Sequence, residues 1–430
     1  YLLCSAINQV SCLMESRRKS TITCDMEGVI DTFNPGAVQM FGYSAEETIG
    51  KLRVSIFSPG EVVLQNLKTW LDTAVRDGEW VGETNFIRKN GELFGARIRI
   101  SPTFRNGVQI GYCGVTEELE APIVVPIRTT TKLLRWLVIT RAPFLTAALT
   151  PVVIGVVWAA YVANVDVNAL YATLAGLGVL LLHLASNVMN DYYDVKSGTD
   201  AANTAYFVQY SGGSRAVEMR LIDLAGTKRV GLTLMGMALA IGLYLTWAVG
   251  LGVLWLGLSG LAIGYFYTAP PLRLVARRGL GELSIGLAFG PLITLGMAYV
   301  CTGEYLLEAF LVGIPAGLLT ANILLINQVP DAAGDAVTGK NHLVVTFGAR
   351  AAVGIYGVIL AAALGSMAWL AYELQRPLLY GVVGVGTIYG LWTWNWMRTH
   401  INERTLVKAN INTIYLQIVV TVLMAIAMAF

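Results

Sequence analysis

The chain has 430 residues, of which 55% are hydrophobic and only 13% are charged, and its mean hydropathy is +0.60. A soluble domain carries about 25% charged residues, so most of this chain is expected to lie in a membrane. The net charge of +2 is too small to indicate a nucleic-acid partner, and none is expected.

The first part of the chain, residues 1–120, is predicted to be a small α+β domain, because charges are dense there and no apolar run reaches spanning length. The stretches "GELFGARIRISPTF" and "GVQIGYCGVTEE" predict strands separated by Gly and Asn turns. The stretch "PGAVQMFGYSAEETIG" predicts short helices, with Ser44 as an N-cap and Glu47 completing a capping box.

This domain resembles a PAS domain. The resemblance rests on "ITCDMEGVIDTFNPGAVQMFGYSAEETIGK" followed by "GEWVGETNFIRKNGELFGARIRISPTF". It implies either a small ligand or a dimer partner for the domain, and the sequence leaves both open. No histidine precedes His183, so a histidine-ligated haem in this domain is not expected.

Residues 121–140 are interpreted as a linker, and residues 141–430 as a multi-pass all-α membrane domain. Each of its apolar segments is near the ~20 residues that a helix needs to span hydrocarbon. Nine transmembrane helices are therefore predicted, over residues 142–162, 168–189, 229–248, 250–268, 282–301, 306–327, 350–372, 377–397 and 410–430.

The distribution of Lys and Arg predicts the orientation of these helices, because cytoplasmic loops are enriched in positive charge. With the N-terminus in the cytoplasm, the loops on the other side of the membrane carry only Arg376. The loops on the cytoplasmic side carry Lys196, Arg215, Arg220, Lys228, Arg229, Arg273, Arg277, Arg278, Lys340, Arg350, Arg398, Arg404 and Lys408. The N-terminal domain is therefore placed in the cytoplasm.

A first acidic cluster ends the second predicted span, in "NDYYDVKSGTD". Asn187, Asn190, Asp191 and Asp194 stand at i, i+3, i+4 and i+7, so they share one face of a helix. Asp200 follows after the "KSG" break. Ionisable residues at the edge of a membrane are functional candidates.

A second acidic cluster ends the sixth predicted span, in "NQVPDAAGD". Asn327, Asp331 and Asp335 stand at i, i+4 and i+8, again on one helical face, and Pro330 fits a kink or a helix start.

The two clusters predict a cation site on the cytoplasmic side. Carboxylates that face each other repel, and a divalent cation removes that repulsion; Mg²⁺ binds oxygen ligands and bridges carboxylates to substrate phosphates. Two simpler interpretations stay open. Asp and Asn near helix ends can be caps or solvated loop residues, and a proton or cation transporter also uses carboxylates at membrane depth.

Basic loops on the same side favour a phosphate ligand. Lys196, Arg215 and Lys340 are expected to bind phosphate, because they lie near the acids or near Gly212 and Gly213, whose amides can approach an anion. Arg273, Arg277 and Arg278 follow Tyr267 in "YTAPPLRLVARRGLGE"; both phosphate binding and a topology signal remain open for them. Arg220, Lys228, Arg229 and the last loop are interpreted as topology signals.

The membrane half resembles the UbiA superfamily of intramembrane prenyltransferases. The motifs that carry the resemblance are "NDYYDVKSGTD", "SGGSRAV", "YTAPPLRL", "GLGE" and "NQVPDAAGDAVTGKNHLVVTFG". The displaced Asp200 and the "GGSRAV" loop are similar to the branch that prenylates 1,4-dihydroxy-2-naphthoate for menaquinone. "GKNHLVV" departs from the "GKRTLAV" common in that branch, which weakens the assignment to the branch but not to the superfamily.

The resemblance implies a Mg²⁺-dependent transfer of a polyprenyl group from its diphosphate to an aromatic acceptor, in a bacterial inner membrane. Asp191, Asp194, Asp331 and Asp335 would be metal ligands and catalytic, with Tyr267 stabilising the allylic cation or orienting the acceptor ring. The implied substrate-binding residues are Asn187, Asn190, Lys196, Asp200, Arg215, Asn327 and Lys340. The alternatives are 4-hydroxybenzoate, haem or chlorophyll prenylation, or a membrane sensor or transporter.

Overall fold

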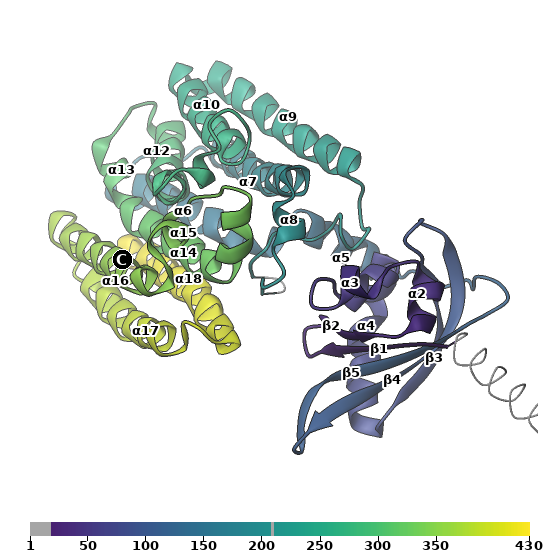
Figure 1. The fold of residues 1–430 in the computed structure, drawn as a ribbon. Helices are drawn as coiled ribbons and strands as arrows, with labels where there is room; N and C mark the ends of the chain where they lie inside the picture. Colours follow the sequence, from purple (N-terminus) through teal and green to yellow (C-terminus); the bar gives the residue numbers. More distant parts are fainter. Residues whose placement is uncertain (1–18, 208–209) are drawn as a thin grey trace, which may run out of the picture. The chain divides into compact units, whose positions relative to one another are not determined.

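The computed structural model describes residues 19–207 and 210–430 (Figure 1). The chain divides into two compact units, which are described separately. Unit 1 contains residues 1–139 together with 215–223, and unit 2 contains 140–214 and 224–430. The sequence predicts a domain over 1–120, a linker over 121–140 and a membrane domain over 141–430, and these bounds stay a prediction; residues 215–223, which lie within the predicted membrane domain, group with unit 1.

Unit 1 is built on one antiparallel sheet of five strands in the order β2-β1-β5-β4-β3 (Figure 1). The strands are β1 (Lys19–Asp25), β2 (Ile30–Phe33), β3 (Trp80–Ile87), β4 (Leu93–Arg105) and β5 (Val108–Glu118). Its helical elements are α2 (Pro35–Phe41), α3 (Ala45–Thr48), η1 (Val54–Phe57), α4 (Gly60–Asp77) and α5 (Thr129–Ile139). The two strands and the short helices predicted from sequence are confirmed.

Local sequence explains the short helices of unit 1. Asn34 caps α2 by accepting from the amide of Ala37, and Gly42 ends α2 in the left-handed conformation with φ of 77°. Ser44 and Glu47 form the predicted capping box at the start of α3. The core is aromatic: Phe41 stacks on Phe57 with ring centroids 4.3 Å apart.

Unit 2 is helical. Its elements are η2 (Ala142–Leu145), α6 (Thr146–Val157), η3 (Trp158–Val162), α7 (Ala169–Ser197), α8 (Thr199–Ala202), α9 (Leu224–Val249), α10 (Leu251–Phe266), η4 (Leu274–Ala276), α11 (Leu280–Leu287), η5 (Ala288–Leu292), α12 (Ile293–Thr302), α13 (Leu307–Val312), α14 (Ile314–Val337), α15 (Leu343–Phe347), α16 (Ala349–Glu373), α17 (Leu378–His400), η6 (Arg404–Leu406) and α18 (Val407–Ala429).

Within the described residues, seven helical segments are long and apolar enough to cross a membrane. They are Ala142–Val162, Ala169–Ser197, Leu224–Val249, Leu280–Thr302, Leu307–Val337, Ala349–Glu373 and Arg404–Ala429. Helices also stand at the other two predicted positions: α10 has only 16 residues, and α17 ends in the polar residues Asn395, Arg398 and His400. A helical membrane unit is thus confirmed, and the count of nine spans stays a prediction.

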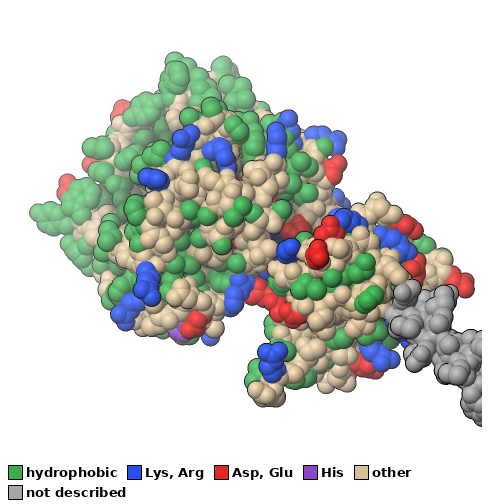
Figure 2. Space-filling view, in the orientation of Figure 1, with side chains coloured by type: hydrophobic (Ala, Val, Ile, Leu, Met, Phe, Trp, Pro, Cys, Tyr) green, Lys and Arg blue, Asp and Glu red, His purple; other side chains and the backbone are tan. Residues whose placement is uncertain are grey.

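Hydrophobic side chains cover much of the face of unit 2 drawn in Figure 2. Large side chains such as Trp247, Val358 and Ile388 are exposed. A soluble protein rarely leaves so much apolar surface uncovered, whereas lipid tails would cover it.

Close glycine contacts hold α14 against the α11–η5 segment. A Cβ atom added at Gly317 would lie 2.0 Å from the carbonyl oxygen of Gly286, and one at Gly290 would lie 2.2 Å from that of Gly313. Gly286 and Gly290 are four residues apart on one segment, and Gly313 and Gly317 are four residues apart on the other. These small residues let the two backbones touch, as is common between membrane helices. This contact fixes the position of α14, which carries the second acidic cluster.

Candidate active site

A cavity of about 390 Å³ lies within unit 2. Its apolar part is lined by side chains such as Leu182, Ile241, Leu254 and Val300. Its polar part includes most of the residues predicted from sequence: Asn187, Asn190, Asp194, Asp200, Tyr267, Asn327, Asp331, Asp335 and Lys340. The polar residues on α7 and α14 lie toward the C-terminal ends of those helices, so the lining changes from apolar to polar along both.

Helix α7 presents the first cluster as predicted. The helix continues to Ser197 and ends at Gly198, whose φ of 80° is accessible to glycine without strain. Asn190 donates from Nδ2 to Oδ2 of Asp194 across one turn, at 3.1 Å. Asp200 lies beyond this break, in α8, and still lines the cavity.

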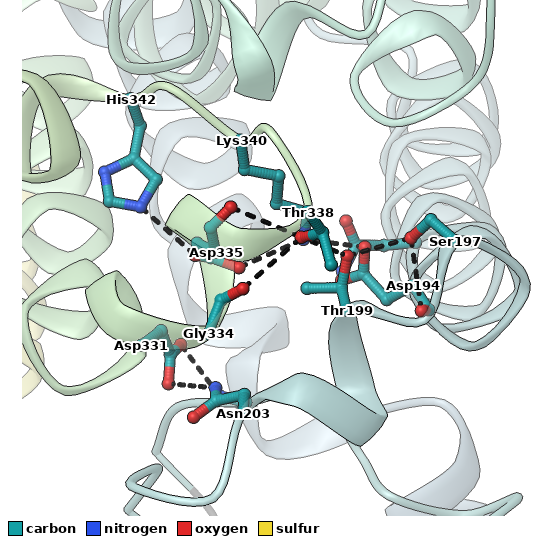
Figure 3. A network of polar contacts seen from close by, with 12 residues as sticks. Asp194, Ser197, Thr199, Asn203, Asp331, Gly334, Asp335, Thr338, Lys340 and His342 are labelled. Atoms are coloured by element: carbon teal, nitrogen blue, oxygen red, sulfur yellow. Dashed lines mark hydrogen bonds and ion pairs between the residues drawn. The ribbon is translucent and has the colours of Figure 1, made fainter.

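Lys340 joins the two acidic clusters (Figure 3). Its Nζ lies 2.6 Å from Oδ1 of Asp194 on α7 and 3.7 Å from Oδ1 of Asp335 on α14. The lysine side chain is 7% exposed and both carboxylates are 9% exposed, so the pair is shielded from water. Burial alone would lower the pKa of Lys340, but the charges of Asp194 and Asp335 reverse that effect and leave the pKa above its ordinary value, so the amine stays charged.

His342 holds the other oxygen of Asp335 (Figure 3). Its Nε2 lies 3.1 Å from Oδ2 of Asp335, and its Nδ1 accepts from the amide of Val345 as the N-cap of α15. The next residue, Leu343, donates its amide to Oε1 of Glu282 on α11. These contacts fix the loop that carries Lys340.

The loop between α8 and α9 contacts both clusters through hydrogen bonds. Asp331 accepts from Asn203 Nδ2 at 2.7 Å, from Ser211 Oγ at 2.9 Å and from the amide of Gly212 at 2.9 Å. Asp191, on α7, accepts from the amide of Ser214 at 3.2 Å. One loop thus binds a carboxylate from each acidic helix end.

Gly213 must be a glycine for this loop to reach Asp191. Its φ is +77°, and a Cβ atom there would lie 2.8 Å from Oδ1 of Asp191. The sequence predicts that backbone amides at Gly212 and Gly213 approach an anion. In the structure the amide of Gly212 donates to the carboxylate of Asp331, so the anion observed there is a side chain, and a phosphate at this loop stays a prediction.

The remaining predicted residues in the cavity wall bind other segments of unit 2 or have no partner among the described residues. Asn187 donates to the carbonyl oxygen of Thr140 at 3.3 Å, and Asn327 accepts from Asn410 on α18 at 2.8 Å. The hydroxyl of Tyr267 is buried and has no hydrogen-bond partner in the described part of the chain.

Two of the predicted phosphate-binding residues are not brought to this cavity. Lys196 is exposed, and its Nζ lies 5.8 Å from the ring centroid of Tyr192. Arg215 is buried, pairs with Glu218 at 3.2 Å, and belongs to unit 1. Neither residue is among those that line the cavity, and their role in binding phosphate stays a prediction.

The donor set fits Mg²⁺ held in part by a substrate. Among residues 19–207 and 210–430, no three His, Cys, Asp or Glu side chains converge as a complete metal site. Mg²⁺ usually takes one or two carboxylates and fills its octahedron with waters and phosphate oxygens. The carboxylates on the two helix ends supply the negative charge that would attract such a cation. In the structure the ammonium of Lys340 balances part of that charge, because it lies between Asp194 and Asp335.

Several residues of this site are not predicted by the sequence patterns. Asn203, Ser211 and His342 bind the predicted carboxylates, but each comes from a loop whose path has no local signal. Arg141 and Gln328 also line the cavity. His183 lines it too, and here a signal existed, because it stands four residues before Asn187 on the same helical face.

Two family models match separate stretches of the chain. Residues 148–414 match the model of the UbiA prenyltransferase family, and residues 18–118 match that of a PAS domain. The chain is 30% identical over 225 residues to the 1,4-dihydroxy-2-naphthoate octaprenyltransferase of Bacillus subtilis, covering 52% of this chain and 70% of that one. It is 28% identical over 265 residues to the Escherichia coli protein of the same name, covering 60% and 79%.

Solved structures show the same fold for unit 2. A UbiA homolog from Archaeoglobus fulgidus bound to GPP and Mg²⁺ superposes with a TM-score of 0.53 at 17% identity, covering 69% of this chain and 99% of that one. A UbiA homolog from Aeropyrum pernix K1 also gives a TM-score of 0.53, at 15% identity, covering 66% and 96%. The chain is an integral membrane protein that belongs to the UbiA prenyltransferase family and carries an N-terminal PAS domain.

Proposed function

We propose that this aromatic prenyltransferase moves a polyprenyl group from an allylic diphosphate to 1,4-dihydroxy-2-naphthoate. The observation that carries the proposal is that one cavity is lined both by apolar side chains and by Lys340 and the acidic ends of two helices. Such a cavity suits a ligand with a charged head and a hydrocarbon tail. The naphthoate is favoured because relatives from two bacteria are named for it.

The diphosphate would bind at the polar end of the cavity. Asp191, Asp194, Asp331 and Asp335 would hold Mg²⁺, which when bound neutralises the diphosphate and makes it a better leaving group. Lys340 would exchange part of its contact with Asp194 for a phosphate oxygen. Asn187, Asn190, Asp200 and Asn327 would orient these groups and ordered waters.

The bond chemistry requires a site that excludes water. The C–O bond of the allylic diphosphate breaks with its electron pair going to the diphosphate, and the ring carbon that bears the carboxylate supplies the pair for the new C–C bond. The ring then loses CO₂, and the electron pair of that bond restores aromaticity. The apolar walls keep water from the allylic cation, and the face of Tyr267 would stabilise it.

The orientation and the role of the PAS domain are part of the proposal. The excess of Lys and Arg on one side would place the acidic ends and the N-terminal domain in the cytoplasm of a bacterial cell, with the protein in the inner membrane. A ligand or a dimer partner of the PAS domain stays a prediction.

Prenyl transfer by purified membranes tests this function. The reaction would contain 1,4-dihydroxy-2-naphthoate or 4-hydroxybenzoate, a polyprenyl diphosphate, and Mg²⁺ or EDTA. We expect product with the naphthoate and Mg²⁺ only, and about 10²–10³-fold less of it from Asp191→Asn or Asp331→Asn. Asp166→Asn is the matched control, because Asp166 is exposed in the loop before α7.

Each alternative predicts a different result. Product with 4-hydroxybenzoate alone would move the protein to another branch of the family. Folded protein that forms no product with either acceptor would favour a sensor or a transporter.

A further inference from the structure

The cavity holds a second set of polar side chains that the diphosphate site does not use. His183 on α7 is 8% exposed and Gln328 on α14 is 5% exposed, and both line the cavity. Nδ1 of His183 and both side-chain atoms of Gln328 are buried without a hydrogen-bond partner among the described residues. A buried polar group without a partner destabilises a protein, so such groups call for an explanation.

Both residues lie on the inner side of the acidic ends. His183 precedes Asp191 by eight residues, or about 12 Å along the helix, and Gln328 precedes Asp331 by three, or about 4.5 Å. On each helix they follow aliphatic lining residues, Leu182 on α7 and Leu324 on α14, and precede the carboxylates. A diphosphate bound at the acidic ends would put its first prenyl carbons at this level.

An irregular helix segment supports His183 from the other side. The ring of Phe289 meets that of His183 edge to face, with centroids 4.7 Å apart and an interplanar angle of 77°. Phe289 lies in the π-helical segment η5, which also contains Pro291, and its own φ and ψ are not helical. Segments of this kind interrupt regular helices often at functional sites.

We infer that His183 and Gln328 bind the oxygen substituents of the aromatic acceptor and select which acceptors enter; this rests on the proposed function. A polyprenyl chain offers no hydrogen-bond partner, so it would leave these groups desolvated and unpaired. An aromatic ring with hydroxyl groups would satisfy them, because neutral imidazole and amide groups each donate and accept.

The test uses near-isosteric variants of the full chain. His183→Phe keeps a ring against Phe289 and removes the nitrogens, and Gln328→Met keeps length and removes the amide. Gln417→Met is the matched control: Gln417 is also a buried glutamine of a membrane helix, but it donates to Thr150 and does not line the cavity.

We expect each cavity variant to raise KM for 1,4-dihydroxy-2-naphthoate about tenfold, while KM for the polyprenyl diphosphate stays within about twofold. The naphthoate alone should raise the melting temperature of wild type and of Gln417→Met, and less so that of the cavity variants. His183→Asn, which restores a hydrogen-bonding group, should recover part of the affinity.

Unchanged acceptor KM in both cavity variants would overturn the inference, as would equal increases for both substrates. Wild type that neither prenylates nor is stabilised by either acceptor would instead remove the proposed function, and the inference with it.

A separate observation concerns the loop that binds Asp191 and Asp331. Its residues Gly212 and Ser214 donate amides to those carboxylates within unit 2. The next residue, Arg215, begins the segment 215–223 that belongs to unit 1. The chain therefore passes directly from the candidate active site into the unit that contains the PAS domain.

The segment 215–223 is firmly packed within unit 1. Ala216 and Leu221 are buried against Ile139 of α5, with Leu64 of α4 beside them. A Cβ atom at Gly60, the first residue of α4, would lie 2.1 Å from the carbonyl oxygen of Met219. The fit leaves no room for a larger residue.

We propose that this packing makes the PAS unit a regulator of the enzyme. Any change in α4 alters the position of 215–223 and, through the peptide bond to Ser214, the amides that hold Asp191 and Asp331. A ligand or a partner of the PAS domain would use the same route.

Two alanine variants of the full chain test this route. Gly60→Ala forces Met219 to move and raises helix propensity, so it does not weaken α4 itself. Gly114→Ala in β5 is the control, because its Cβ would meet only ordinary contacts, the nearest at 3.7 Å.

We expect Gly60→Ala to raise KM for the polyprenyl diphosphate at least about fivefold and to speed amide hydrogen exchange at 212–214. Gly114→Ala should match wild type in both. Wild-type exchange and kinetics in Gly60→Ala, or equal changes in the two variants, would overturn the proposal.

Discussion

The two units of this chain use the same kind of ion pair in opposite surroundings. In the PAS unit, Lys19 and Glu117 lie 2.7 Å apart with 57% and 49% of their side chains exposed. In the membrane unit, Lys340 and Asp194 lie 2.6 Å apart with 7% and 9% exposed. The distances are nearly equal, but water screens the first pair and not the second, so removing one partner is expected to destabilise the protein strongly only at the second pair.

The cores of the units differ in the same way. Unit 1 is filled by large aromatic side chains such as Phe41, Phe57 and Phe94, which the hydrophobic effect drives together. Where α14 meets α11 and η5 in unit 2, glycines bring the backbones into direct contact. Lipid gives no hydrophobic drive between helices, so close packing takes its place. The following substitutions test both contrasts.

The largest effect is expected for Asp331→Asn. Asparagine keeps the shape and part of the contacts with Asn203, Ser211 and Gly212, but it removes the charge that a divalent cation needs. We expect kcat/KM for prenyl transfer to fall by about 10²–10³, the loss typical of one electrostatic group in an active site. Steady-state kinetics across a Mg²⁺ series would measure it. Activity close to wild type would mean that the acidic ends are structural.

Lys340→Met should affect stability as well as activity. It leaves Asp194 and Asp335 buried without their cation, which typically destabilises a protein by about 3–5 kcal/mol. Thermal unfolding of the purified protein in EDTA would show the loss, and added Mg²⁺ should restore part of it. Lys196→Met is the matched control, because Lys196 is exposed. Equal melting temperatures for the two variants would remove the contrast between buried and exposed charge.

The acidic residues of the site show how far the sequence predicts it. Helical spacing placed Asp191 and Asp194 on one face and Asp331 and Asp335 on another, because periodicity is a local property. Helix α14 continues through Pro330 to Val337, so the proline neither starts nor breaks it. What the acids bind within the protein was not predictable, because it depends on contacts between elements far apart in the chain.

Lys196, His342 and Arg215 illustrate this dependence on contacts between distant elements. Lys196 stands beside Asp194 in sequence but points to Tyr192 and solvent, whereas Lys340 reaches Asp194 from another segment. In the sequence His342 stands only as part of a departure from a common motif, and the structure makes it the partner of Asp335. Arg215 follows a predicted anion loop yet belongs to unit 1.

A smaller effect is expected for Gly317→Ala at the contact of α14 with Gly286. The added methyl group would meet a backbone oxygen, and overpacking of this kind typically destabilises by about 1–3 kcal/mol. Gly365→Ala on α16 is the control, because its Cβ would meet nothing within 4 Å. Thermal unfolding of both variants measures the difference. If Gly317→Ala unfolds at the same temperature as wild type, the helices can move apart without loss of stability. Close backbone contact would then not be what stabilises this core.

The smallest effect is expected for the exposed pair of unit 1. The hydrogen bond from Lys19 lowers the pKa of Glu117 from its usual 4.5, so folding favours the charged carboxylate. Stability from this source is present above that pH and is lost as the pH falls through the folded-state pKa. Because both side chains are about half exposed, Glu117→Gln should change stability by less than about 1 kcal/mol at pH 7. Amide hydrogen exchange in β1 and β5 of the full chain would measure this, at low and high salt. A large, salt-insensitive loss would show that exposure does not weaken this pair, and the contrast with Lys340 would then need another cause.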